Sequence, residues 1–190
     1  EKSEKNIDLV HRSSLILLYR ILFVLNAESR GLLPVENKKY RADISLEYLK
    51  QALVEEEMEE FGESTWLWQE RIKSLFEAIN EGKDYGNFQI PAYNGGLFDK
   101  EESKEKQFLE EHQLTGNQIK KIIKLLASTQ EKDEIQLIDY TDLNIRHLGS
   151  IYEGLLEHEL QVAEEKKNTG KETIEKGQLY LANESGERKT

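Results

Sequence analysis

The sequence contains no cysteine and only two prolines, Pro34 and Pro91, among 190 residues. Without cysteine the chain can form neither a disulfide framework nor a thiolate metal site, which is compatible with a reducing cytoplasm. Proline interrupts helices and is frequent at the turns of sheet proteins, so its scarcity favours long helices over a many-stranded sandwich. We therefore expect a mainly α fold in a cytoplasmic protein.

Positive charge is also scarce. The 26 lysines and arginines face 37 aspartates and glutamates, which gives a net charge of -11 with histidine neutral. A surface that binds DNA phosphates needs clustered lysine and arginine, whereas the run at residues 55–63 is strongly acidic. We expect weak or no DNA binding by this chain alone, so any DNA contact would be local or supplied by other parts of a longer protein.

Long apolar runs are absent as well. Residues 14–25 are the most hydrophobic stretch, but they include Arg20 and are well short of the ~20 apolar residues that a membrane span needs. Residues 1–8 lack the apolar core and cleavage site of a signal peptide and do not begin with methionine. We expect no membrane association, and we expect Glu1 to lie inside a longer chain.

Apolar residues recur at spacings of three and four over much of the chain, which predicts helices. The expected helices cover residues 6–28, a segment on Leu46, Leu49 and Leu53 capped by Asp43 or Ser45, a segment from Ser64 or Thr65 to Gly82, residues 118–126, and a segment opened by Arg146 and His147. Between them we expect a polar loop at residues 35–43, an ordered aromatic loop at 82–99, a solvated charge run at 100–106 and an extended segment at 135–140.

The pattern changes near the C-terminus. Short apolar runs at residues 160–163 and 178–182 flank a polar, glycine-containing piece, which predicts a β-hairpin with a mobile connection. The expected architecture is an irregular multi-helix bundle with a small C-terminal β-hairpin. We assign residues 1–157 to a helical scaffold domain and residues 158–190 to the hairpin and a lead-in to a further domain.

Three segments carry a family resemblance: LYRILFVLNAESRGLLP at residues 18–34, IPAYNGGLFD at 90–99 and DLNIRHLGSIYEGLLEHEL at 142–160. In sequence and in order they resemble the helical region before the catalytic domain of large bacterial and archaeal DNA adenine methyltransferases, which include the type IIG restriction-modification enzymes. The resemblance implies a scaffold that positions the catalytic and DNA-recognition parts of such an enzyme. It also implies that residues 186–190, GERKT, lead into the first cofactor motif, so we expect the longer protein to continue there.

The chain lacks the catalytic motifs of that family. A methyltransferase of this class needs a glycine-bearing turn for S-adenosylmethionine and an Asn-Pro-Pro-Tyr type tetrapeptide for the flipped adenine, and neither proline lies in such a setting. We therefore expect no catalytic, cofactor or metal residues here. S-adenosylmethionine would bind elsewhere in the longer protein, and Mg²⁺ would be needed only if that protein carries a nuclease. Glu102-Ser103-Lys104 and Glu164-Glu165-Lys166 match half of a nuclease motif, which we attribute to coincidence.

Two charged pairs are candidates for interdomain or DNA contacts. Glu28 and Arg30 lie in a stretch that matches the family's Ala-Glu-x-Arg-Gly sequence, and they either receive a neighbouring domain or form local bonds at the helix end. Arg146 and His147 either contact DNA phosphates or serve a helix-capping or interdomain role.

A third candidate is the turn of Tyr93, Asn94, Gly95 and Gly96. Its backbone amides could approach a phosphate, or its glycines could meet the positive φ of a tight turn. For the helix opened by Arg146 we expect full burial of Ile151 and Leu155 against the first helix, with Glu153 off that face. The alternative function is a free-standing helical adaptor that binds a protein partner through an apolar groove.

Overall fold

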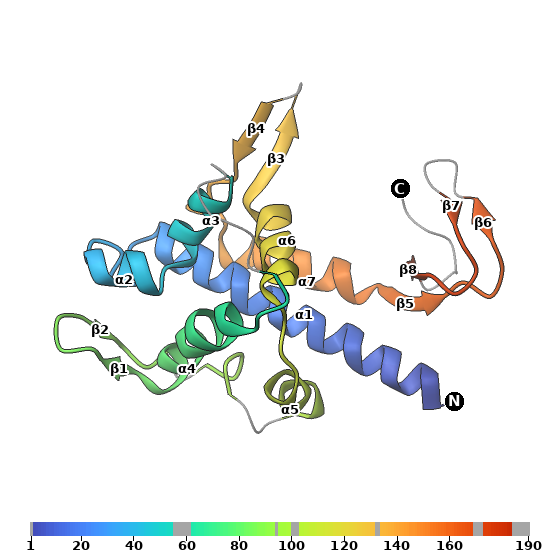
Figure 1. Cartoon of the computed structure of the whole chain (residues 1–190), viewed down its shortest axis with the longest axis horizontal. Helices are drawn as coiled ribbons and strands as arrows, with labels where there is room; N and C mark the ends of the chain where they lie inside the picture. Colours follow the sequence, from blue (N-terminus) through green and yellow to red (C-terminus); the bar gives the residue numbers. More distant parts are fainter. Residues whose placement is uncertain are drawn as a thin grey trace. The chain divides into compact units, whose positions relative to one another are not determined.

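The computed structural model describes residues 2–54, 62–93, 95–99, 103–131, 134–168 and 173–183 (Figure 1). The chain is mainly α-helical with short antiparallel strand pairs, which confirms the predicted fold class. It divides into two compact units, Leu17–Leu143 and a unit that combines Glu1–Ile16 with Asn144–Thr190. The assignment of residues 1–157 and 158–190 to separate domains follows element type, and it stays a prediction.

Helix α1 (Lys2–Ser29) supplies the core of the larger unit. From Leu17 onward it buries a broad apolar surface, with Val24 and Leu25 at 0% exposure. It ends as expected at Gly31, which adopts a φ of 66°, while Leu32 N–H donates to the Ala27 carbonyl. Neither α1 nor any other helix of the described residues is long and apolar enough to cross a membrane.

Two helices follow α1. The expected polar loop is wrong at α2 (Lys38–Asp43), because the Asn37 side chain accepts hydrogen bonds from two backbone amides and starts a helix that buries Tyr40 completely. Helix α3 (Leu46–Val54) is confirmed: its apolar face is buried, and Ser45 Oγ accepts a hydrogen bond from the Tyr48 N–H at 3.0 Å.

The next predicted helix is present but not uniform. It begins as a π-helix, η1 (Leu67–Lys73), and continues as α4 (Ser74–Glu81). Spacings of three and four do not separate these two forms, so the π-turn could not be predicted. Gly82 ends the helix with a φ of 75°, and a Cβ there would lie 3.0 Å from the Ala92 nitrogen, which favours glycine at this close approach.

The aromatic loop that follows is ordered over its described residues, as predicted. It contains an unpredicted hairpin of β1 (Lys83–Asp84) and β2 (Gln89–Ile90). Phe98 is 3% exposed, and its ring lies 5.4 Å from that of Phe23 and 5.5 Å from that of Phe76. These edge and tilted contacts fix the end of the loop against α1 and α4.

Helix α5 (Lys104–Glu111) corrects the expectation of a solvated charge run, although residues 100–102 lie outside the described residues. The Ser103 side chain caps the helix. Lys106 is only 8% exposed, because its Nζ atom turns inward and donates to the Gly96 carbonyl at 2.5 Å. A charge run in sequence therefore includes one buried cation in the structure.

Helix α6 (Gly116–Ala127) is confirmed and starts with a capping box of Thr115 and Gln118. It packs on α3 and leads into a hairpin of β3 (Ser128–Glu131) and β4 (Glu134–Leu137), seen in Figure 1. The extended segment expected at residues 135–140 is present in β4. Its partner β3 was missed because its sequence, STQE, lacks apolar alternation.

The second unit holds α7 (Ile145–Leu156) and the C-terminal strands. The predicted hairpin is confirmed: β5 (His158–Val162) pairs with β8 (Leu179–Asn183), with Leu160 opposite Leu181. Its connection contains a second, unpredicted antiparallel pair, formed by β6 (Lys167–Asn168) and β7 (Thr173–Ile174).

The predicted burial of α7 is wrong. Ile151 is 36% exposed and Leu155 is half-buried, although Glu153 is exposed as expected. Among the described elements, α7 packs chiefly on β5. The periodicity correctly indicates an apolar face, but it contains no information on whether this chain covers that face.

Candidate interdomain site

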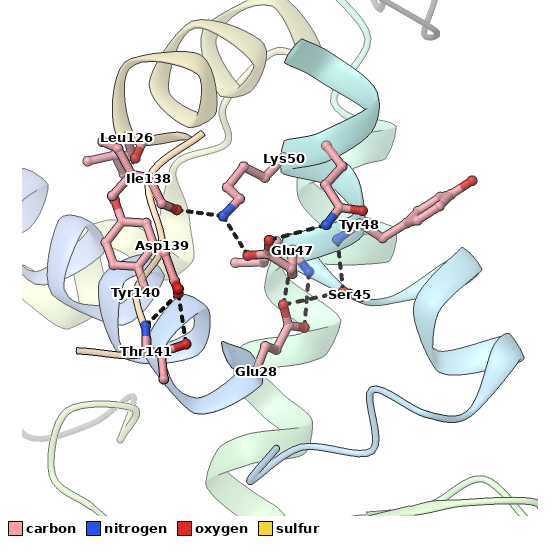
Figure 2. A network of polar contacts seen from close by, with 12 residues as sticks. Glu28, Ser45, Glu47, Tyr48, Lys50, Leu126, Ile138, Asp139, Tyr140 and Thr141 are labelled. Carbon is pink, nitrogen blue, oxygen red and sulfur yellow. Dashed lines mark hydrogen bonds and ion pairs between the residues drawn. The ribbon is translucent and has the colours of Figure 1, made fainter. Parts of the chain in front are cut away.

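Glu28, the first residue of the predicted pair, is buried at the start of α3. It is 3% exposed, and its carboxylate accepts hydrogen bonds from Tyr40 Oη at 2.5 Å, Leu46 N at 3.1 Å and Glu47 N at 2.6 Å. Ser45 Oγ donates from 3.3 Å. Figure 2 shows the carboxylate directed at the first turn of α3, where free N–H groups and the helix dipole favour negative charge. The helix that Glu28 caps is therefore α3 and not its own.

Burial changes the pKa values of Glu28 and of its hydrogen-bond partner Tyr40. Loss of water raises the pKa of Glu28, while the bonds from Tyr40, Glu47, Leu46 and Ser45 act in the opposite direction. Burial also raises the pKa of Tyr40, and the neighbouring Glu28 charge adds to this effect. Tyr40 therefore stays protonated and remains a hydrogen-bond donor.

Arg71 binds the other side of the α2–α3 junction. It lies on η1, is 6% exposed, and its Nε donates to the Asp43 carbonyl at 3.1 Å while Nη2 bonds the Ala42 carbonyl. These carbonyls belong to the last turn of α2, where a cation is favoured by the dipole. Burial lowers the pKa of Arg71, and Asp43 and Glu28 oppose the change. An anion from α1 and a cation from η1 thus fix the two helix ends that meet here.

Lys50 forms a second buried contact, shown in Figure 2. It is 2% exposed; its Nζ donates to the Ile138 carbonyl at 2.8 Å and pairs with Glu47 Oε2 at 2.7 Å. The same nitrogen lies 5.5 Å from the centroid of the Tyr140 ring. Lys50 therefore joins α3 to the segment that follows β4.

Asn26 holds the next part of that segment. Its Nδ2 donates to the carbonyls of Tyr140 at 2.8 Å and Leu143 at 2.7 Å. Tyr140 Oη donates to the Leu126 carbonyl at 2.5 Å, and burial raises the pKa of Tyr140 to about 12. The chain after β4 is consequently bound to α1, α3 and α6 by side-chain contacts.

The predicted turn at residues 93–96 belongs to a loop bound along α1. Tyr93 is half-buried and its Oη donates to the Leu32 carbonyl at 2.6 Å. Arg20 is 2% exposed; its Nε donates to the Leu97 carbonyl at 2.9 Å and its Nη2 to the Asp99 carbonyl at 3.3 Å. The loop backbone is therefore held by side chains from α1 and from the loop itself.

The remaining candidates of the larger unit are Arg30, Asn94, Gly95 and Gly96. Arg30, Gly95 and Gly96 are exposed, and Asn94 lies outside the described residues. Gly95 does not adopt a positive φ, so a left-handed backbone at that position does not account for it.

Arg146 and His147 are exposed on the first turn of α7. Helix capping falls to Asn144, whose Oδ1 accepts a hydrogen bond from His147 N at 3.0 Å. These two residues belong to the second unit, and the other candidates belong to Leu17–Leu143. The structure therefore does not unite the candidates within one unit.

Among the residues that the structure describes, sequence reasoning missed four buried cations, Arg20, Lys50, Arg71 and Lys106. Each donates to a backbone carbonyl outside its own helix. A signal was present for Arg20, which interrupts the most hydrophobic run of the chain. Because these charges bind backbone groups, the arrangement holds segments in fixed positions.

Among the described residues, no group of three histidine, aspartate or glutamate side chains is placed to hold a metal ion. In comparisons with known proteins, no family model, no curated protein and no solved structure matches the chain. The functional assignment therefore depends on the three resembling segments and on how they are joined.

Proposed function

We propose that this chain is the helical scaffold of an S-adenosylmethionine-dependent DNA adenine methyltransferase of the type IIG restriction-modification or a related phage-defence kind. One observation carries the proposal: the first resembling segment, residues 18–34, binds the second segment and the first residues of the third, whose remainder from Asn144 belongs to the smaller unit. Tyr93 bonds the Leu32 carbonyl, and Arg20 bonds the Leu97 carbonyl. Asn26 bonds the Leu143 carbonyl, at the beginning of the third segment. The first two segments and the start of the third thus belong to one unit, which supports a common role.

A scaffold suits the chemistry of the proposed enzyme. Base flipping requires the catalytic pocket and the DNA-recognition part to keep a fixed geometry, and supporting contacts must be rigid to about 0.5 Å. Buried side-chain contacts to loop backbones, as made by Arg20 and Lys50, support such a role.

The other partners of the proposed enzyme follow from its class. DNA and S-adenosylmethionine would bind other parts of the longer protein, in the cytoplasm, and Mg²⁺ would be required only if a nuclease is fused to it. The chain alone would methylate nothing. Its acidic composition supports a role in which another part of the protein binds the phosphates.

The open reading frame provides the first test. Continuation beyond Thr190 into a glycine-rich cofactor turn and an Asn-Pro-Pro-aromatic tetrapeptide would support the proposal, and a stop codon there would overturn it.

The second test uses the longer protein and measures methyl transfer from labelled S-adenosylmethionine to duplex DNA. Asn26→Ala should lower the rate of transfer because it releases the Tyr140 and Leu143 carbonyls from α1. Asn117→Ala, at an exposed position, is the matched control and should leave the rate unchanged. Equal rates of methyl transfer for both variants would contradict the proposed role of these contacts.

An adaptor function is the second candidate, favoured by the exposed apolar face of α7. Ile151, Tyr152 and Leu156 are 36%, 44% and 48% exposed. A partner protein could cover these side chains, and so could another domain of a longer chain. A reading frame that stops at Thr190, together with a stable complex of this chain with a separate protein, would favour the adaptor.

A further inference from the structure

The smaller unit contains an open groove that none of the preceding contacts uses. It has a volume of about 840 Å³ and lies within the unit formed by Glu1–Ile16 and Asn144–Thr190. Ile7, Asp8 and His11 of α1 line one part, and residues 159–162 of β5 line another. A groove of this size has room for several residues of an extended peptide.

The groove follows a strand with a free edge. β5 pairs with β8 on one side, and among the described strands none lies on its other side. Successive side chains of a strand point to opposite faces, so the four consecutive residues of β5 in the lining present both faces to the groove, which also reaches Tyr180 of β8. Backbone N–H and C=O groups on a free edge can pair with an added strand.

The charge of the lining favours a basic occupant. Its carboxylates are Asp8, Glu159, Glu164 and Glu165. Asp8 already pairs with Arg12 at 2.9 Å, and Lys167, the lysine of the lining, donates to Tyr180 Oη at 2.7 Å. Burial lowers the pKa of His11, which favours the neutral ring, while Asp8 and Glu159 act in the opposite direction. Phosphates would be repelled here, whereas lysine and arginine would find acceptors.

We propose that this groove binds a basic protein segment in an extended conformation, as a strand added to the free edge of β5. Alternate side chains of the segment would point to one face, where Glu159 accepts a lysine or arginine, and Glu164 and Glu165 beyond the end of β5 provide further acceptors. The intervening side chains would meet Leu160 and the 41% exposed Val162. This inference goes beyond the scaffold role and is independent of methyl transfer.

The test is fluorescence anisotropy of a labelled peptide of alternating lysine and valine, titrated with the 190-residue chain at physiological salt. We expect saturable binding. A peptide with a central proline, which lacks an N–H for strand pairing, and a peptide of alternating glutamate and valine should both bind at least about tenfold more weakly. These comparisons use the unmodified chain, so they do not depend on the folding of a variant.

Variants then locate the site. Glu159→Gln combined with Glu164→Gln should weaken binding about fivefold, as expected for two exposed ion pairs. Glu153→Gln, an exposed change outside the groove, should leave it unchanged. Absence of binding, equal binding of the proline peptide, equal loss in the Glu153 variant, or tight binding of the acidic peptide or of duplex DNA would each overturn the proposal.

Discussion

The contribution of Glu28 to stability can be worked out from its contacts. Of the four donors to Glu28, the three closest are the N–H groups of Leu46 and Glu47 and the hydroxyl of Tyr40, and replacement of Glu28 by alanine leaves them without this acceptor. An unsatisfied buried donor costs about 1 to 3 kcal/mol, so three donors set a range of about 3 to 9 kcal/mol.

Two effects favour the low end of that range. A cavity of about 180 Å³, lined by Glu28, Ser45 and Tyr48 among others, lies beside the carboxylate, and water there could serve some of the donors. The substitution also removes the free-energy cost of burying the carboxylate, the same desolvation that raises the pKa of Glu28. We therefore expect a loss of about 3 kcal/mol, a large part of the 5 to 15 kcal/mol typical of a domain.

The measurement is urea unfolding followed by far-ultraviolet circular dichroism. Glu28→Gln keeps a carbonyl acceptor and should lose less, about 1 to 2 kcal/mol. Glu63→Ala, at an exposed position outside this cavity, is the matched control and should change the free energy of unfolding by under ~0.5 kcal/mol. A Glu28→Ala variant within about 1 kcal/mol of the unmodified chain would show that capping of α3 contributes little.

Four further predictions follow from other contacts. Lys50→Met keeps the apolar stem but leaves the Ile138 carbonyl without its donor, so urea unfolding should show a loss of about 2 to 4 kcal/mol; an unchanged midpoint would contradict the role of this contact. Leu25→Ala, at a position with 0% exposure, should lower the free energy of unfolding by about 2 to 5 kcal/mol, whereas Leu125→Ala, at a position with 72% exposure, should lower it by under ~0.5 kcal/mol. Similar losses would mean that the core is misassigned. Burial raises the pKa of Tyr140 from its ordinary value of 10.0 to about 12 in the folded chain. Its contribution to the free energy of unfolding is therefore complete below pH 10 and is lost as the pH rises toward 12. Alkaline unfolding of Tyr140→Phe should lack that part of the pH dependence. Finally, calorimetry should detect no binding of S-adenosylmethionine by this chain, and duplex DNA should bind poorly at physiological salt; micromolar binding of either would refute the prediction.

The helices that could be predicted are those in which burial follows the helical period. In α3 and α6 the buried leucines and isoleucines recur at three and four residues, and the caps at Ser45 and Thr115 are residue types that favour a helix start. Tertiary packing and local sequence agree in these elements.

The elements that were missed have local sequences that do not indicate their structure. Helix α2 has one buried residue, Tyr40, and its start depends on the Asn37 side chain. Strand β3 is polar and is defined by its pairing with β4. The open face of α7 depends on which surfaces the chain supplies, which periodicity does not specify.

The candidate site could be predicted only in part, since its contacts join distant positions. Glu28 was identified from a motif, but its acceptor role at α3 depends on residues up to 19 positions away. Lys50 reaches a carbonyl 88 positions away, and Arg20 reaches one 79 positions away. No local pattern specifies which carbonyl a buried cation will meet.

These buried charges are better explained by positional specificity than by stability. Replacement of a buried ionic contact by well-packed apolar residues is often neutral or stabilising, because desolvation offsets much of the attraction. Such contacts still determine which backbone groups come together, since an unpaired buried charge destabilises the alternatives. In this chain Arg20 and Lys50 each select a loop segment, and Arg71 selects a helix end. In the proposed scaffold role, which requires other domains to be held in one geometry, that selection matters more than additional stability.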